Sequence, residues 1–68
     1  MYIIVDESTY NTILQAYGAD FVIFDEDENE YGVYYLELID AGYAQEIDGA
    51  IYTISMNPSQ KGIFIGNL

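Results

Sequence analysis

The side chains of this sequence that could take part in catalysis are carboxylates, tyrosines, a few hydroxyls and one lysine, and five of the carboxylates fall within the six residues from Asp25 to Glu30. Twelve acidic residues stand against a single basic one, Lys61, and the sequence contains no His, Cys, Arg or Trp. Most of the nucleophile and base pairings that enzymes use are therefore excluded. Two acids could serve a glycosidase, but that reaction needs a deep cleft, which so small a chain can scarcely form. We expect a protein that is not an enzyme and that binds no cofactor.

The same acidic run shares part of its spacing with a calcium-binding loop. Asp25, Asp27 and Asn29 match the first three ligand positions of such a loop. The sixth position is Glu30, where the turn requires Gly, and the twelfth is Leu36, where a bidentate Glu is required. The pattern therefore favours a solvated hairpin loop, with a weak divalent-cation site as the less favoured alternative. We predict no metal ligands in this chain.

The elements that position these acids begin with a short apolar strand, Met1 to Val5, and an amphipathic helix from Asp6 to Gly18. Asp6 is expected to cap the first turn, and Gly18 is expected to end the helix. The apolar residues recur with the spacing of one buried helical face. They are Tyr10, Ile13, Leu14 and Tyr17.

From Asp20 onward the apolar period changes to two, which predicts a run of antiparallel strands. The predicted strands are 21–24, which reads as a central strand, and 31–39, 51–56 and 63–65. Asp48-Gly49 predicts a type I′ hairpin turn, because both central positions of that turn need positive φ. This turn places Glu46 opposite Ile51, so an acid and an aliphatic share a face. The composition of 57–62 predicts a loop.

These elements predict a single α+β domain over residues 1–68, with one short N-terminal helix packed on a four- to five-stranded, mainly antiparallel sheet. One helix can cover only one face of that sheet. If 31–39 is a strand, Tyr31, Val33, Tyr35 and Ile39 point to the other face. We therefore expect a homodimer or a partner protein to bury that face.

Neither a signal peptide nor a membrane span is expected in this chain. The N-terminus has no basic region followed by a long apolar stretch, so we predict no signal peptide. No apolar run approaches the roughly 18 residues that a membrane span needs, so we expect no membrane partner.

The excess of acids points to a positively charged partner. Alternate strand residues lie about 6.6 Å apart, which is comparable to the spacing of neighbouring phosphates, so Asp25 with Asp27, or Glu37 with Asp40, could imitate nucleic acid. Tyr31 and Tyr35 could act as interface anchors beside these acids. The predicted partner-binding residues are Asp25, Glu26, Asp27, Glu28, Glu30, Tyr31, Tyr35, Glu37 and Asp40. The plainer alternative is that the acids merely fill exposed loops.

Small size, absence of cysteine, extreme acidity and eight tyrosines together resemble the small inhibitors that bacteriophages encode against host nucleic-acid-binding machinery. These include anti-restriction, anti-CRISPR and uracil-glycosylase inhibitor proteins. The resemblance covers the composition of the whole chain and implies binding to a basic nucleic-acid channel of a host defence protein, or beside it, often by a dimer. It also implies a location in the cytoplasm of an infected bacterium. Direct nucleic-acid binding is disfavoured, because single-strand stacking platforms lie in positively charged grooves.

A second function remains open from the sequence. The chain could be a small acidic structural or adaptor subunit that dimerises through its tyrosine-rich sheet face, with its charge serving only solubility.

Overall fold

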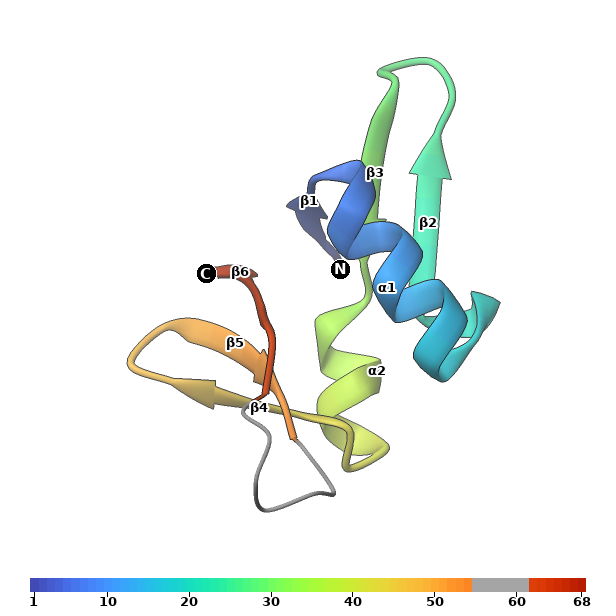
Figure 1. Cartoon of the computed structure of the whole chain (residues 1–68). Coiled ribbons are helices and arrows are strands. Elements are labelled where there is room, and N and C mark those ends of the chain that lie inside the picture. The colour runs from blue at the N-terminus through green and yellow to red at the C-terminus, as the bar shows by residue number, and fades with distance from the viewer. Residues whose placement is uncertain (55–61) are drawn as a thin grey trace.

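A computed structural model describes residues 1–54 and 62–68 of the chain. Within these residues the fold comprises two helices, one 3₁₀ turn and two three-stranded antiparallel sheets (Figure 1). The predicted α+β class is confirmed, but the single helix and the single four- to five-stranded sheet are wrong. The elements in chain order are β1 (Ile3–Val5), α1 (Glu7–Tyr17), η1 (Ala19–Phe21), β2 (Val22–Asp25), β3 (Glu30–Val33), α2 (Tyr35–Asp40), β4 (Ala44–Ile47), β5 (Ala50–Thr53) and β6 (Phe64–Asn67).

Helix α1 forms as its sequence predicts. The Thr9 N–H donates to the Asp6 carboxylate at 2.7 Å, and Gly18 follows the last helical residue. Ile13 is fully buried, and the other apolar residues of the predicted face pack against the core. An amphipathic stripe with a capping residue thus determined this helix locally.

The N-cap gives the protein an acid-sensitive contact. The hydrogen bond from Thr9 holds the pKa of Asp6 below its ordinary value of 3.8. The stabilising effect of this hydrogen bond is therefore complete above pH 3.8, and it disappears as the pH falls through the lower pKa that Asp6 has in the folded protein. We expect Asp6→Ala to lower the thermal midpoint at neutral pH by several degrees. Asp6→Asn keeps an acceptor that does not titrate, so its midpoint should change less between neutral and acid pH than that of the parent. Circular dichroism melts across this pH range test both expectations, and equal pH dependence of Asp6→Asn and the parent would contradict the second.

The first sheet has the strand order β1-β3-β2. Both neighbours of β3 are antiparallel to it, with Val33 paired to Ile3 on one side and to Val22 on the other. The prediction of a central strand at 21–24 is wrong, because Phe21 ends the 3₁₀ turn and β2 lies at the edge of its sheet. Of its apolar residues only Val22 is buried, whereas Ile23 is half-buried and Phe24 is exposed.

Residues 31–39 do not form one strand. β3 ends at Val33, Tyr34 departs from strand geometry with ψ at 82°, and α2 begins at Tyr35. The helix then buries Tyr35 and Leu38, three residues apart, while Leu36 stays exposed. Over so short a segment the Leu, Glu and Ile residues fit the period of a strand as well as that of a helix. The hydrophobic pattern could therefore not distinguish the two.

The faces of this segment are also opposite to those expected. Tyr31 and Val33 point toward α1, since the Tyr31 ring lies 4.8 Å from the ring of Tyr10 and Val33 is fully buried. Tyr35 is 8% exposed, and its hydroxyl donates to the Met1 sulfur at 3.3 Å. Tyr31, Val33 and Tyr35 therefore do not form the exposed face that was expected to need a dimer partner.

The second sheet has the order β4-β5-β6. The predicted hairpin turn is confirmed, with φ of 52° at Asp48 and 82° at Gly49. The pairing of Glu46 with Ile51 is confirmed too, and it is tolerated because Glu46 lies on the edge strand β4, exposed, while Ile51 is buried on the central strand. β5 ends at Thr53, and the rest of the predicted strand and loop, residues 55–61, lies outside the described residues.

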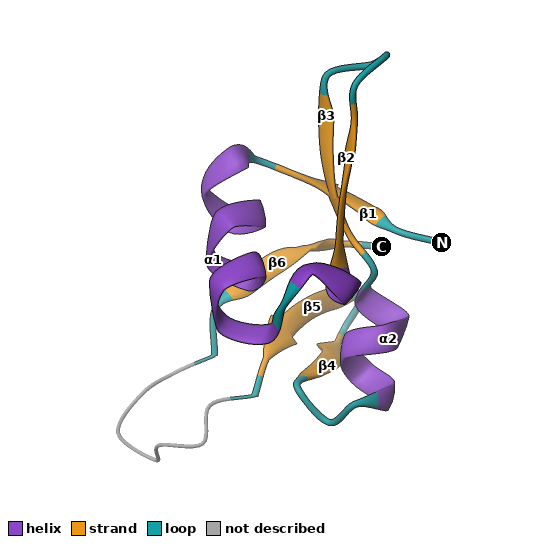
Figure 2. Ribbon diagram, turned by 90° about the vertical axis from the view of Figure 1, so that its right-hand side faces the viewer, coloured by secondary structure: helices purple, strands orange, loops and turns teal. Residues whose placement is uncertain are grey.

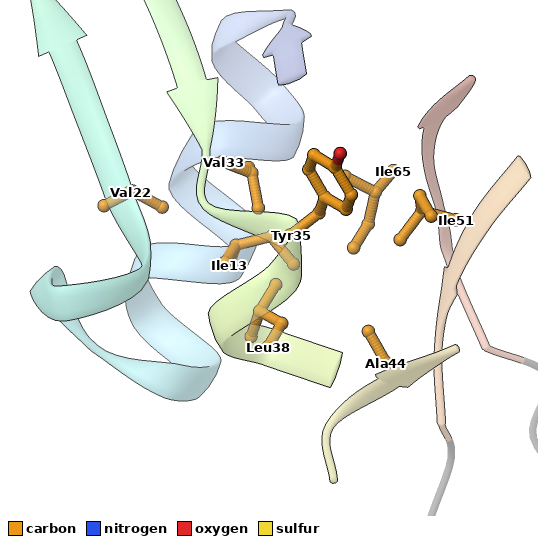
Figure 3. Close-up of a cluster of buried hydrophobic side chains, with 8 residues drawn as sticks. All are labelled: Ile13, Val22, Val33, Tyr35, Leu38, Ala44, Ile51 and Ile65. Atoms are coloured by element: carbon orange, nitrogen blue, oxygen red, sulfur yellow. The ribbon is translucent and has the colours of Figure 1, made fainter. Parts of the chain in front are cut away.

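Both helices and both sheets contribute to one buried cluster (Figure 3). β6 contacts β1, so the two sheets meet beside this cluster. In the described residues no helix is long and apolar enough to cross a membrane. The cluster comprises Ile13, Val22, Val33, Tyr35, Leu38, Ala44, Ile51 and Ile65.

Candidate partner-binding site

The acidic run forms the end of the β2–β3 hairpin, and we call Asp25–Glu30 the acidic tip. In Figure 1 this hairpin extends away from the second sheet, and its turn is the most distant part of the first sheet. Asp25 shapes the turn, because its carboxylate accepts from the Asp27 N–H at 3.0 Å and from the Glu28 N–H at 3.3 Å. Asn29 completes the turn with φ of 53°.

Electrostatic repulsion is concentrated at this tip. Asp25 and Glu30 are directly paired across the two strands, where like charges are unfavourable. Glu26, Asp27 and Glu28 are exposed in the turn between them. The sequence has one basic side chain for twelve acidic ones, so internal ion pairs cannot neutralise the tip. The arrangement therefore offers a concentrated negative potential to an approaching cation.

The acidic side chains are not spaced along a strand in the way that was expected to imitate phosphates. Asp27 lies in the turn, so Asp25 and Asp27 are not alternate residues of one strand. Glu37 and Asp40 are likewise on a helix, α2, and not on a strand. The spacing argument from the sequence is wrong for both pairs, although the clustering of charge remains.

The structure brings only part of the predicted site together. Asp25, Glu26, Asp27, Glu28 and Glu30 form the acidic tip, whereas Glu37 and Asp40 are on α2, at the other end of the β3 strand from the tip (Figure 1). Tyr35 lies in the core and is not offered to a partner.

Tyr31 is close to the tip and half-buried. Its ring packs between Tyr10 and Phe24, with centroid distances of 4.8 Å and 4.7 Å. Partial desolvation, followed by the negative charge of Glu7, raises the pKa of Tyr31 above its ordinary value of 10.0. This tyrosine therefore supports the hairpin against α1 and stays protonated at neutral pH.

Two hollows lie in the described surface away from the tip. Within the described residues no three Asp or Glu side chains are grouped so that they could hold a metal ion. A groove of about 600 Å³ runs between β1 and the end of β6, lined by apolar residues that include Tyr2, Ile4 and Leu68. A smaller hollow of about 210 Å³ lies between β4 and β5, beside Gln45 and Tyr52. No Asp or Glu side chain lines either hollow, so neither offers a pair of acidic side chains for general acid and base catalysis.

One exposed apolar group on the first sheet was not among the residues predicted from the sequence. Ile4, on β1, leaves 59% of its surface exposed, and Tyr2 leaves 37% exposed. The signal was present in the strand period, since Ile3 and Val5 face the core and Ile4 must then face outward.

Comparison with protein-family models, with curated proteins and with solved structures finds no significant match to this chain.

Proposed function

We propose that this protein is a non-enzymatic inhibitor that uses its acidic tip to bind the basic nucleic-acid-binding surface of a host defence protein, of the restriction or CRISPR type, in the cytoplasm of an infected bacterium. The observation that carries the proposal is the position of five carboxylates at the end of a projecting hairpin. Proteins that bind nucleic acid recognise phosphates through clustered Lys and Arg. A concentrated cluster of carboxylates can compete for the same cations.

The shape of the tip supports this function in a further way. Asp25 uses one carboxylate oxygen to hold the backbone of the turn, which fixes the positions from which Glu26, Asp27 and Glu28 project. A turn held in this way loses less conformational entropy on binding than a mobile acidic tail would lose. The adaptor function is not proposed, since the expected face on which it depended, with Tyr31, Val33 and Tyr35, is turned toward α1 and the core.

The proposal is tested by DNA cleavage assays with purified restriction endonucleases and CRISPR effector nucleases, in the presence and absence of the protein. We expect inhibition of at least one enzyme, relieved by excess DNA that is not cleaved. A tip variant should weaken that inhibition by at least about tenfold, equivalent to about 1.4 kcal/mol. It combines Asp25→Asn, Asp27→Asn, Glu28→Gln and Glu30→Gln. The amide introduced by Asp25→Asn still offers an oxygen to the N–H groups of the turn.

A matched control variant removes the same number of charges elsewhere. It combines Glu37→Gln, Asp40→Asn, Glu46→Gln and Asp48→Asn, all at positions outside the tip. Asn is well suited to the positive φ of residue 48. We expect this control to inhibit within about threefold of the parent, a change of less than about 1 kcal/mol. Equal loss in both variants would show that overall charge acts, and not the tip. Failure of excess DNA to relieve inhibition would reject binding in the nucleic-acid groove.

A further inference from the structure

The first sheet has one covered face and one uncovered face. Val33 and Tyr31 lie on the face toward α1, whereas the register row Ile4, Gly32 and Ile23 points the other way. Figure 2 shows α1 on one side of this sheet. Ile4 leaves 59% of its surface exposed, beside the groove that it lines with Leu68, and Ile23 is only half-buried. We call this row, with the rings of Tyr2 and Tyr34, the outer face.

Aromatic contacts hold the outer face in a defined shape. The Tyr2 ring lies directly over Gly32, where a Cβ would collide with it and would also come within 3.0 Å of the Ile23 side chain. Tyr2 also packs edge-to-face on Tyr34, with centroids 5.9 Å apart and planes at 88°. An aromatic ring that covers a glycine in a strand stabilises the pairing. The outer face is therefore a preformed apolar surface, which needs little ordering before it binds.

The outer face continues into the acidic tip. Asp25 and Glu30 are paired two residues beyond the pair of Ile23 and Gly32, so they occupy the next row on the same side of the sheet. An apolar row is thus bordered at one end by two acids that are unfavourably paired with each other. A cation from outside the chain would relieve that repulsion.

We propose that the outer face and the acidic tip together dock a protein partner that presents an apolar patch bordered by Lys and Arg. The inference rests on the proposed function and specifies the surface of the same basic partner. Protein interfaces combine an apolar, aromatic centre with a polar rim, and Tyr is common at their centres. A stable interface covers about 800 Å² on each partner, about one sixth of the 4618 Å² surface of this chain. The turn at the tip is too small to supply that area, and the adjoining outer face extends it.

Charge argues against a second copy as the occupant. Each chain carries a formal charge of −11 with one basic residue, so two copies would bring no cluster of cations to the acids at the end of the outer face. A basic partner supplies charge of the required sign along the same border.

The test uses two helical peptides of equal length and charge as probes, one built of Lys and Leu and the other of Lys and Ala. Each is titrated into the isotope-labelled full chain at low ionic strength, followed by amide shifts and calorimetry. We expect the Lys/Leu peptide to bind at least about tenfold more tightly, with shifts at Ile4, Ile23 and Gly32 as well as at the tip. Ile4→Thr should remove most of this preference. Ile47→Thr is the matched control, because Ile47 is 48% exposed on the edge strand β4 of the other sheet, and it should keep the preference.

The outcomes separate the two proposals. Equal binding of both peptides, confined to the tip and lost in the tip variant, overturns the role of the outer face and leaves the proposed function standing. If the tip variant still binds both peptides, the acidic tip is not a recognition element, and both proposals are overturned. Self-association that Ile4→Thr abolishes would assign the outer face to a second copy and overturn the basic partner. Since Thr is also β-branched, a spectrum with the parent's dispersion confirms that the Ile4→Thr strand is intact.

Discussion

Leu38→Ala is expected to lower the free energy of unfolding by about 2–5 kcal/mol. Leu38 is fully buried on α2, among the core residues that both sheets contribute. A hydrophobic core in a chain below about 70 residues rarely supplies more than about 3–5 kcal/mol. The substitution therefore removes most of the available stability, and the variant should be largely unfolded at room temperature.

Urea denaturation followed by circular dichroism measures this loss, and Leu36→Ala provides the matched control. Leu36 lies on the same short helix but is 47% exposed. Its substitution should change the free energy of unfolding by no more than about 0.5 kcal/mol, as is usual for surface positions. The comparison is specific to the helix, because a strand over these residues would place Leu36 and Leu38 on one face and make both substitutions similar in cost. Similar losses in the two variants would contradict α2.

The local signals in this sequence were sufficient for the elements they specify. Asp6 and the stripe around Ile13 specify α1, and the pair Asp48-Gly49 specifies the β4–β5 hairpin with its register. In each case the determining groups are neighbours in the sequence: a side chain with a nearby backbone N–H, or two residues that accept positive φ. The α+β class followed from these elements.

Elements whose conformation depends on distant residues could not be predicted. Leu36, Glu37 and Leu38 fit a strand as well as a helix, and packing of Tyr35 and Leu38 against the rest of the core decides the outcome. The split into two sheets depends on where β1 and β6 pair, which local periodicity does not encode.

The candidate site, too, could be predicted only in part from the sequence. The acidic tip was visible because five acids are close together in the sequence. The outer face was not, because Ile4 and Ile23 are brought together only by the pairing of β1 and β2 with β3. Tyr35 was assigned to the surface because the strand prediction placed it there. An error in one element therefore carried over into the site.

Gly62 lies against the backbone of Thr53 at the end of β5, and its substitution is expected to have the second large effect on stability. A Cβ at residue 62 would collide with the backbone carbonyl of Thr53. That carbonyl cannot move aside, because the Thr53 N–H is bonded to the Ile63 carbonyl at 2.9 Å and the Ile54 N–H to the Tyr43 carbonyl at 2.8 Å. The Ile63 N–H is in turn bonded to the Thr53 hydroxyl at 2.8 Å. We expect Gly62→Ala to cost about 1–3 kcal/mol, as overpacking typically does.

Gly66→Ala separates this backbone collision from simple crowding. A Cβ at residue 66 would lie 2.7 Å from the terminal methyl of Ile3, which is the end of a side chain and can change rotamer. Its loss of stability should therefore be clearly smaller than that of Gly62→Ala, although Gly66 lies on β6 in direct register with the buried Ile51. Urea midpoints of the two variants and the parent give the comparison. A midpoint for Gly62→Ala at or above that of Gly66→Ala would mean that the Thr53 backbone yields, and that the hydrogen bonds between Thr53 and Ile63 do not fix how the chain enters β6.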